Sequence, residues 1–557
     1  MMNKKRFFTL LLSCLASSSV WADGITTRAS VANFGLQANA DSFASRQAIS
    51  QNGRYVVFQS LANDIDLNDR NNVFDIFVHD QWAKQTQRIS VSSLGEGNAD
   101  STQAVISDNG RMVAFTSFAS NLSEGDVNGV SDVFLYDRFT AILTNLTQAG
   151  DGASSNPMLS ADGQRVVFES TATNLAEGDT NAASDIFLYD VATAQISRIS
   201  TDSAGIEADN ASYKPSISND GSRIAFQSLA SNLVLNDTND KADIVFVDLN
   251  TGERRIVSVT NDGTPANNHS YAPMISGSGL HVVFDTDASN LYLNDTNGFS
   301  DVVFYDLTTN QLTRMSFGDG GEPNFNAVLP SISDTGLFIN YESAANNLIK
   351  GDDNTVVDVF RVNRSNGERK MLSVASSGEA ANFSTFQLGN SMASEQCFTA
   401  FSSPATNLVD EDTNRSFDVF LHTEVLEAAT FQTADEEGTT VALLNIPTVA
   451  LATGQVYSVQ LRWNGDVNDL SFELTNGQEL AVGSPNNACS FVAQDASLVY
   501  VPVVNALAPT GEVVARYEVT LQINFTEEQV FKFALTNATL HPIPPTPTPE
   551  EPEAVTE

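Results

Sequence analysis

The chain has 557 residues, a formal net charge of −40 and 42% hydrophobic residues. This length exceeds what one ordinary hydrophobic core holds, so we expect more than one domain. The strong negative charge argues against binding to nucleic acids and to anionic membranes, because both require a basic protein surface. It is compatible with divalent cations or basic partners.

Residues 1–22 have the features of a cleaved secretory signal peptide. Three basic residues at 4–6 precede an apolar run over 7–15, and a small-residue cleavage site ends at Ala22. This run is too short to span a bilayer, and no later segment is apolar for long enough to do so. We therefore expect a periplasmic or secreted protein. The segment before Cys14 also resembles a lipoprotein signal, which we rank second.

A phrase that joins a polar loop to a short apolar strand then occurs seven times. In the second repeat it reads DVNGVSDVFLYD, from Asp126 to Asp137, and successive copies begin 53 to 60 residues apart. The apolar runs are four to six residues long and rich in Val, Ile and Phe, which is typical of buried strands rather than helices. Each repeat predicts four strands, named a to d, and in the second repeat these lie at 103–107, 112–117, 133–136 and 141–147.

Four-stranded units at this period predict the blades of a β-propeller. The seventh repeat stops after strand c, at Thr423, and lacks a strand d. The chain begins, after the signal, with 27–31 (TRASV), which matches the strand-d phrase of other repeats, such as 87–90 (QRIS). We therefore predict that residues 23–423 form a seven-bladed propeller closed by the N-terminal strand, rather than an open solenoid.

The repeat resembles the TolB-like, WD-like β-propeller family over residues 25–423. The resemblance rests on the turn Gly, the apolar strand, and the Asn-Leu, Asp-Thr-Asn, Asp-Val-Phe and Tyr-Asp elements, which recur in register. It implies a propeller fold, but related propellers serve as scaffolds, receptors and occasionally enzymes, so it does not settle the function.

The repeat is lost after residue 423. Residues 424–540 contain short runs in which apolar and polar residues alternate, which favours a β-sandwich-like domain with one solvated face. Residues 541–557 are rich in Pro and Glu and predict a disordered tail. Cys397 and Cys489 could pair in an oxidising compartment or remain two buried thiols, and both alternatives stay open.

The loops between strands b and c carry the candidate site residues. Each loop has an Asp, an Asn two positions later and a second Asp four positions after that. Oxygen ligands at alternating positions, closed by a later carboxylate, suit a hard cation such as Ca²⁺. Asn and Asp also hold tight turns without any metal, and we favour this structural interpretation. The candidate calcium ligands are Asp69, Asn71, Asp75, Asp126, Asn128, Asp132, Asp179, Asn181, Asp185, Asp237, Asn239, Asp243, Asp295, Asn297, Asp301, Asp352, Asn354, Asp358, Asp412, Asn414 and Asp418.

Signals for catalysis are few. The sequence has no G-x-S-x-G, no H-E-x-x-H, no C-x-x-C and no P-loop, and it has only five His. His269 lies in a loop between strands d and a, from which it could face the channel, but a lone His at such a position is more often a surface residue than a base or a metal ligand. We assign no catalytic or cofactor-binding residue.

Strand order in a propeller puts the b–c and d–a loops on the same face, which should therefore be rich in Asp and Asn. We expect a non-enzymatic, monomeric scaffold that binds an envelope or extracellular protein or peptide through this face. The alternatives are a propeller-type hydrolase or lyase acting on an extracellular polymer, and a calcium-stabilised structural module. An enzyme should break the seven-fold pattern around the channel with His, Arg, Lys or Tyr.

Overall fold

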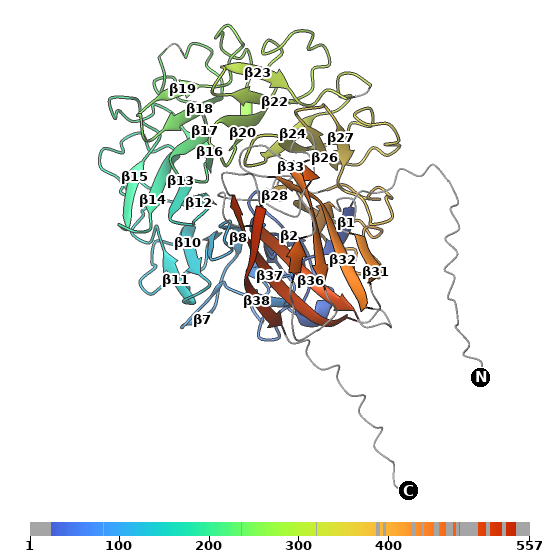
Figure 1. Cartoon of the computed structure of the whole chain (residues 1–557). Coiled ribbons are helices and arrows are strands. Elements are labelled where there is room, and N and C mark those ends of the chain that lie inside the picture. Colours follow the sequence, from blue (N-terminus) through green and yellow to red (C-terminus); the bar gives the residue numbers. More distant parts are fainter. Residues whose placement is uncertain are drawn as a thin grey trace, which may run out of the picture.

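The computed structural model describes residues 24–424, apart from 82, 236, 319, 386–389 and 394–396, together with the backbone of eight strands between 430 and 541. Seven four-stranded antiparallel sheets are arranged around a common centre (Figure 1). The predicted seven-bladed β-propeller is therefore confirmed.

The four strands of each blade follow one another outward from the centre. In blades 1 to 3 they are β2 (Ser42–Phe43), β3 (Tyr55–Ser60), β4 (Asp75–Asp80) and β5 (Gln85–Arg88); β8 (Ser101–Ile106), β9 (Met112–Ser117), β10 (Asp132–Asp137) and β11 (Ile142–Asn145); β12 (Ser154–Leu159), β13 (Arg165–Ser170), β14 (Asp185–Asp190) and β15 (Gln195–Arg198). In blades 4 to 6 they are β16 (Ser212–Ile217), β17 (Arg223–Ser228), β18 (Asp243–Asp248) and β19 (Arg254–Ile256); β20 (Ser270–Ile275), β21 (His281–Thr286), β22 (Asp301–Asp306) and β23 (Gln311–Arg314); β24 (Ala327–Ile332), β25 (Phe338–Ser343), β26 (Asp358–Asn363) and β27 (Arg369–Met371).

Blade 7 joins the two ends of the repeat region. Its strands are β28 (Ser391–Ala393), β29 (Phe398–Ser403), β30 (Asp418–Glu424) and the N-terminal β1 (Gly24–Arg28). Strand β1 pairs antiparallel with β30, and Arg28 lies opposite Phe420. The predicted closure by the N-terminal strand is confirmed, with β1 beginning slightly earlier in the chain than the phrase 27–31.

Paired aromatic side chains fill the blades between strands b and c. Phe115 of β9 lies opposite Phe134 of β10, with ring centroids 5.6 Å apart, and both side chains are fully buried. The same pairing recurs in blades 1, 3, 6 and 7 at 5.7 to 5.8 Å. Stacked aromatic pairs add to area burial, so the apolar runs of strands b and c supply the core of each blade.

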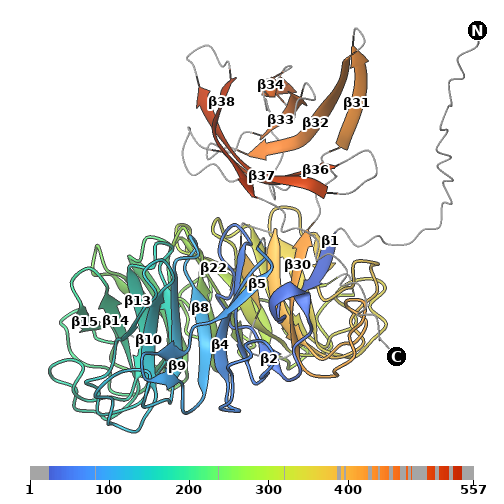
Figure 2. The same ribbon diagram turned by 90° about the horizontal axis from the view of Figure 1, so that it is seen from below.

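The antiparallel order places the loops on two opposite faces (Figure 2). The b–c and d–a loops lie on one face, which we call the loop face, and the a–b and c–d turns lie on the other. The d–a loops also contain the 3₁₀ helix η1 (Asn33–Gly35) and the short hairpin of β6 (Val91–Ser92) and β7 (Gly95–Glu96).

Strands continue beyond the propeller. One sheet contains β31 (Thr430–Glu436), β32 (Thr439–Ala450), β33 (Val456–Trp463), β34 (Phe472–Leu474) and β35 (Gln478–Glu479), and another contains β36 (Val499–Leu507), β37 (Val513–Phe525) and β38 (Phe531–His541). Residues 1–22, Cys489 and residues 542–557 lie outside the described part, so the signal peptide, the disulfide and the disordered tail stay predictions. Cys397 is buried. In the described part, no helix is long and apolar enough to cross a membrane.

Candidate functional site

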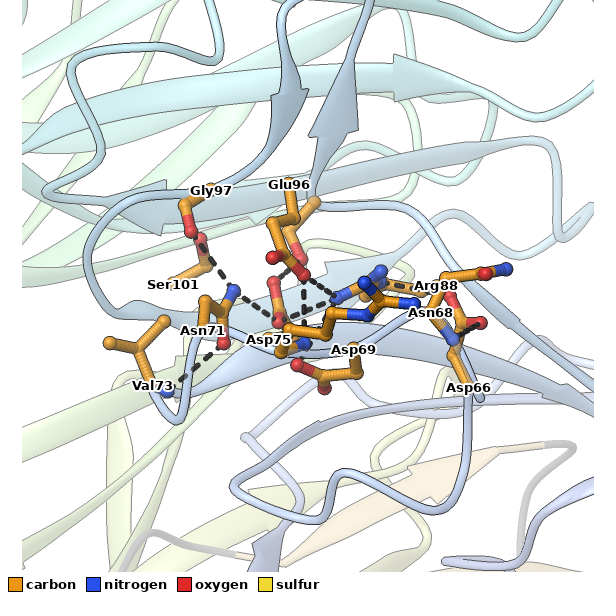
Figure 3. Close-up of polar contacts among 12 residues, drawn as sticks. Asp66, Asn68, Asp69, Asn71, Val73, Asp75, Arg88, Glu96, Gly97 and Ser101 are labelled. Atoms are coloured by element: carbon orange, nitrogen blue, oxygen red, sulfur yellow. Dashed lines mark hydrogen bonds and ion pairs between the residues drawn. The ribbon is translucent and has the colours of Figure 1, made fainter.

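The b–c loop of blade 1 holds a cluster of carboxylates around one arginine (Figure 3). Arg88, the last residue of β5, places its Nη1 3.3 Å from Asp69 Oδ1 and 3.2 Å from Asp75 Oδ2. The same nitrogen lies 3.2 Å from Glu96 Oε2 in the d–a loop. The Arg88 side chain is 4% exposed and that of Asp75 is 0% exposed, so this is a buried cation with several carboxylate partners.

The second Asp of every loop is fixed by a hydroxyl group from strand d or the residues just after it. In blade 3, Ser200 Oγ donates to Asp185 Oδ1 and accepts the backbone N–H of Ile186 at 3.0 Å. The equivalent hydroxyls are Ser90, Thr147, Ser258, Ser316, Ser373 and Ser30. These bonds join strands c and d at the loop face, so the second Asp has a structural role in all seven blades.

The Asn of each loop closes a turn. Asn71 Oδ1 accepts the backbone N–H of Val73 at 3.1 Å, and Asn71 Nδ2 donates to the carbonyl oxygen of Gly97 in the d–a loop at 2.9 Å. An N–H two residues further on is bound in the same way by Asn128, Asn181, Asn239, Asn297, Asn354 and Asn414. This is the arrangement expected of a turn-forming Asn, and it uses the amide oxygen that a metal would need.

The arginine is present in only four of the seven blades. Arg88, Arg198, Arg314 and Arg28 all lie opposite the third residue of strand c. Arg314 Nη2 is 2.7 Å from Asp301 Oδ1, and Arg28 contacts both Asp412 and Asp418 at 3.1 Å. At the same register position, blades 2, 4 and 6 carry Asn145, Ile256 and Met371.

Three carboxylates come together in blade 3. Oxygen atoms of Asp179, Asp185 and Glu207 lie within 4.8 Å of one another, which is close enough to share a metal ion. However, Arg198 Nη1 lies 3.6 Å from Asp179, 3.7 Å from Asp185 and 3.0 Å from Glu207. The guanidinium group therefore already supplies the positive charge at this place.

Burial raises the pKa of several loop carboxyls. It raises the pKa of Asp243 to about 6 and that of Asp358 to about 7, and in each case the first Asp of the loop acts in the same direction. The pKa of Asp69 is also raised to about 6 by burial and by Asp75, although Arg88 acts to lower it. A buried negative charge is costly without a cation, so these groups hold protons or bind cations more readily than an exposed Asp.

The centre of the ring contains a second group of charged residues. Arg46, beside the innermost strand of blade 1, reaches across to blade 5, where Nη2 donates to the carbonyl oxygens of Ala272 and Pro273 at 2.8 Å. Asp285 on β21 is 5% exposed, and burial raises its pKa to about 7, while Lys214 and Arg46 act to lower it. These three charged residues break the seven-fold pattern of the ring.

Four of the five histidines have described side chains. Three of these form hydrogen bonds with other residues of the propeller. His269 Nδ1 accepts the backbone N–H of Ala242 at 2.9 Å. His79 Nδ1 is 2.8 Å from Thr86 Oγ1, and His422 Nδ1 is 2.9 Å from Thr26 Oγ1. His281 stacks on Phe304 at 5.1 Å. His269 thus orders a loop of blade 4.

The sequence predictions included the loop Asp and Asn residues but not their arginine and hydroxyl partners. The signal for these partners is the phrase Arg-x-Ser at the end of strand d, as in Arg88-Ile89-Ser90, which we used to predict the closure of the ring but did not connect with the loop carboxylates. It recurs in the blades that carry the arginine, thirteen residues after the second Asp in blades 1, 3 and 5.

No family model and no curated protein matches the chain. Solved structures match at low identity. An oligogalacturonate lyase in complex with manganese has 10% identity and a TM-score of 0.46, covering 73% of this chain and 97% of that one. An oligogalacturonate lyase from Vibrio parahaemolyticus has 11% identity and a TM-score of 0.45, covering 72% and 98%. A structure assigned to TolB from Agrobacterium tumefaciens has 16% identity and a TM-score of 0.31, covering 49% and 80%. The chain is thus distantly similar to β-propellers of these kinds.

Proposed function

We propose that this chain is a non-enzymatic, monomeric propeller scaffold of the periplasm or the extracellular space, and that it binds a protein or peptide through its loop face. The expected signal peptide over 1–22 supports the location. The region after residue 424, which we propose to be a β-sandwich-like domain, would position the propeller or add a second contact.

The observation that carries this proposal is the distribution of exposed apolar side chains. Single exposed hydrophobic residues are common, but a one-sided distribution marks interaction surfaces. In the described part of the chain, all but three of the large exposed hydrophobic residues lie on the b–c and d–a loops. The loop-face residues are Leu36, Leu67, Leu94, Phe118, Val127, Ile206, Leu229, Leu235, Leu293, Phe317, Phe325 and Phe383.

Blade 5 and the loop that follows it concentrate these residues. Leu293 is 91% exposed, Phe325 is 52% exposed and Phe317 is 49% exposed. Phe325 stacks on Phe299 with ring centroids 5.7 Å apart, which fixes an aromatic pair at the loop face. Aromatic side chains surrounded by acidic loops suit a partner segment that is both basic and apolar.

The test is capture of envelope proteins on the immobilised chain, compared between two triple variants. The first variant replaces Leu293, Phe317 and Phe325 by Glu. The control replaces by Glu the three exposed residues that lie off the loop face, Phe139, Ile142 and Leu280, so the change in charge is the same. A stoichiometric partner retained by the wild type and the control but lost by the first variant supports the proposal. Equal retention by both variants, or no partner at all, contradicts it.

A second candidate is a hydrolase or lyase that acts on an extracellular polymer in the channel. The charged residues Arg46, Lys214 and Asp285 favour it, because the pKa of Asp285, raised to about 7, suits a general acid or base. Polymer cleavage by the wild type that is lost in Asp285→Asn, with an unchanged melting temperature, would support this candidate. Absence of cleavage across acidic and neutral polysaccharides and peptides would count against it.

A further inference from the structure

We infer that the b–c loops of blades 2, 4 and 6 each bind one hard divalent cation of the Ca²⁺ type between their two Asp carboxylates, where blades 1, 3, 5 and 7 place an arginine. The three sites are Asp126 with Asp132, Asp237 with Asp243, and Asp352 with Asp358. The inference concerns the framework and does not rest on the proposed partner binding.

The first argument is the equivalence of the positions. In all seven blades, one residue of strand d pairs with the third residue of strand c, which lies two residues after the second Asp of the loop. Where this residue is Arg, its guanidinium group lies 2.7 to 3.7 Å from the second Asp. The fold thus places a cation at this point in four blades. Asn145, Ile256 and Met371 cannot supply a charge in the other three.

The second argument is the state of the carboxylates in those three blades. Asp126 is 8% exposed, Asp243 1% and Asp358 0%. One side-chain oxygen of each, Oδ1 of Asp126 and Oδ2 of Asp243 and Asp358, is buried and accepts no hydrogen bond of good geometry within the described residues, although the amides of Asn239 and Asn354 lie close enough to Asp243 and Asp358 to lower their pKa. A buried carboxylate oxygen without a partner is costly, and a second carboxylate beside it adds repulsion.

The charged groups around these three carboxylates do not offset the free-energy cost of burying them. Asp126 faces Asp132, Asp243 faces Asp237, and Asp358 faces Asp352, and each neighbour raises the pKa of the group it faces. No basic side chain is among the causes that shift these three groups. In blades 1 and 3, by contrast, Arg88 Nη1 lies 3.3 Å from Asp69 and Arg198 Nη1 lies 3.7 Å from Asp185.

The ligand chemistry indicates the class of cation. Two carboxylates carry two negative charges, which one divalent ion balances. The available donors are oxygens, with backbone carbonyls of the loop and water to complete six to eight ligands, and this is the preference of Ca²⁺. Mg²⁺ demands a stricter octahedron and keeps most of its water, so it should bind more weakly at such a pair.

The experiment measures Ca²⁺ bound per chain by equilibrium dialysis of the purified chain after treatment with a chelator. We expect three ions per wild-type chain, and weaker binding of Mg²⁺. Asn145→Arg, Ile256→Arg and Met371→Arg should each remove one ion, because the new guanidinium takes its place. The matched control is Ile142→Arg, which adds the same charge to the same strand as Asn145→Arg at a position 58% exposed, and it should keep three ions.

The converse change tests the same reasoning in blade 3. Arg198→Met leaves Asp179, Asp185 and Glu207 without their cation and should create a fourth Ca²⁺ site. A melting curve in Ca²⁺ and in chelator checks that each variant folds, and every protein that keeps bound ions should melt higher in Ca²⁺ than in chelator. No bound Ca²⁺ in the wild type, which is the result expected if each carboxylate pair shares a proton instead, would overturn the inference. So would a stoichiometry that the three arginine substitutions leave unchanged.

Discussion

The arginine of blade 7 should contribute more to stability than an exposed arginine with equally short contacts. Arg28 Nη2 lies 3.1 Å from Asp412 Oδ2 and its Nε lies 3.1 Å from Asp418 Oδ2, with side chains that are 9%, 2% and 0% exposed. Arg28→Met keeps most of the apolar stem but leaves two buried carboxylates facing each other. Breaking a buried ion pair by removing one partner costs about 3–5 kcal/mol. The loss falls on β1, the strand that closes the ring.

The matched control is Arg111→Met. Arg111 is 50% exposed and pairs with Asp137 at 2.7 Å. Exposed ion pairs contribute little to stability, because water and salt screen the two charges. The assay is urea denaturation of both variants in chelator, followed by tryptophan fluorescence and by circular dichroism, together with hydrogen exchange of β30. A loss in Arg28→Met no larger than that in Arg111→Met would refute the reasoning, because burial would then make no difference to the pair.

Three further predictions follow from single contacts. Ser200→Ala removes the hydroxyl that donates to buried Asp185, and should cost about 1–3 kcal/mol in urea denaturation, whereas the exposed Ser231→Ala should cost less than about 0.5 kcal/mol. Phe115→Ala leaves a cavity beside Phe134, and a loss below about 2 kcal/mol in the same assay would contradict our account of the blade core. Burial raises the pKa of Glu342 to about 8, so the folded state holds a proton that the unfolded state releases above about pH 4.3. This group should therefore make wild-type stability fall as the pH rises from about 4.3 to about 8. Glu342→Gln should reduce that slope, leaving the contributions of Asp285 and Asp358, and should be the more stable protein at pH 9.

The propeller could be predicted because the repeat period, the composition of the short strands and the phrase at the N-terminus all indicate the same fold. The loop phrase sets the period, and the short Val-, Ile- and Phe-rich runs match the observed strands b and c closely, as in β9 over Met112–Ser117. Closure was predictable because the end of the N-terminal strand carries the same Arg-x-Ser phrase as the strands β5, β15 and β23. The regular repeat leaves few other ways to pair these strands.

The sites were only half predictable. Spacing within one loop identified the Asp and Asn residues, because a loop is local in the sequence. The partners are not local in the sequence. Arg88 lies thirteen residues after Asp75, and Arg28 lies at the opposite end of the repeat region of the sequence from Asp412, although the two side chains are in contact. Arg46 reaches a strand 226 residues away across the channel, and no sequence pattern marks such a contact. Sequence periodicity made the seven loops look equivalent, whereas side chains on a neighbouring strand make them differ.

The proposed Ca²⁺ sites of blades 2, 4 and 6 should affect the stability of the propeller and its binding to a basic partner in opposite directions. The loop face carries exposed apolar residues among acidic loops, and the proposed partner is basic. If the loops of blades 2, 4 and 6 hold Ca²⁺, removal of the ions destabilises the propeller but makes the loop face more negative. Attraction to a basic partner should then increase in chelator at low salt, and the increase should vanish near 1 M salt because charges are screened within about 3 Å. Loss of the partner in chelator at every salt concentration would show instead that the ions maintain the shape of the binding surface. The arginine variants of the three loops should behave like the calcium-bound wild type in both media, since their guanidinium groups cannot be chelated.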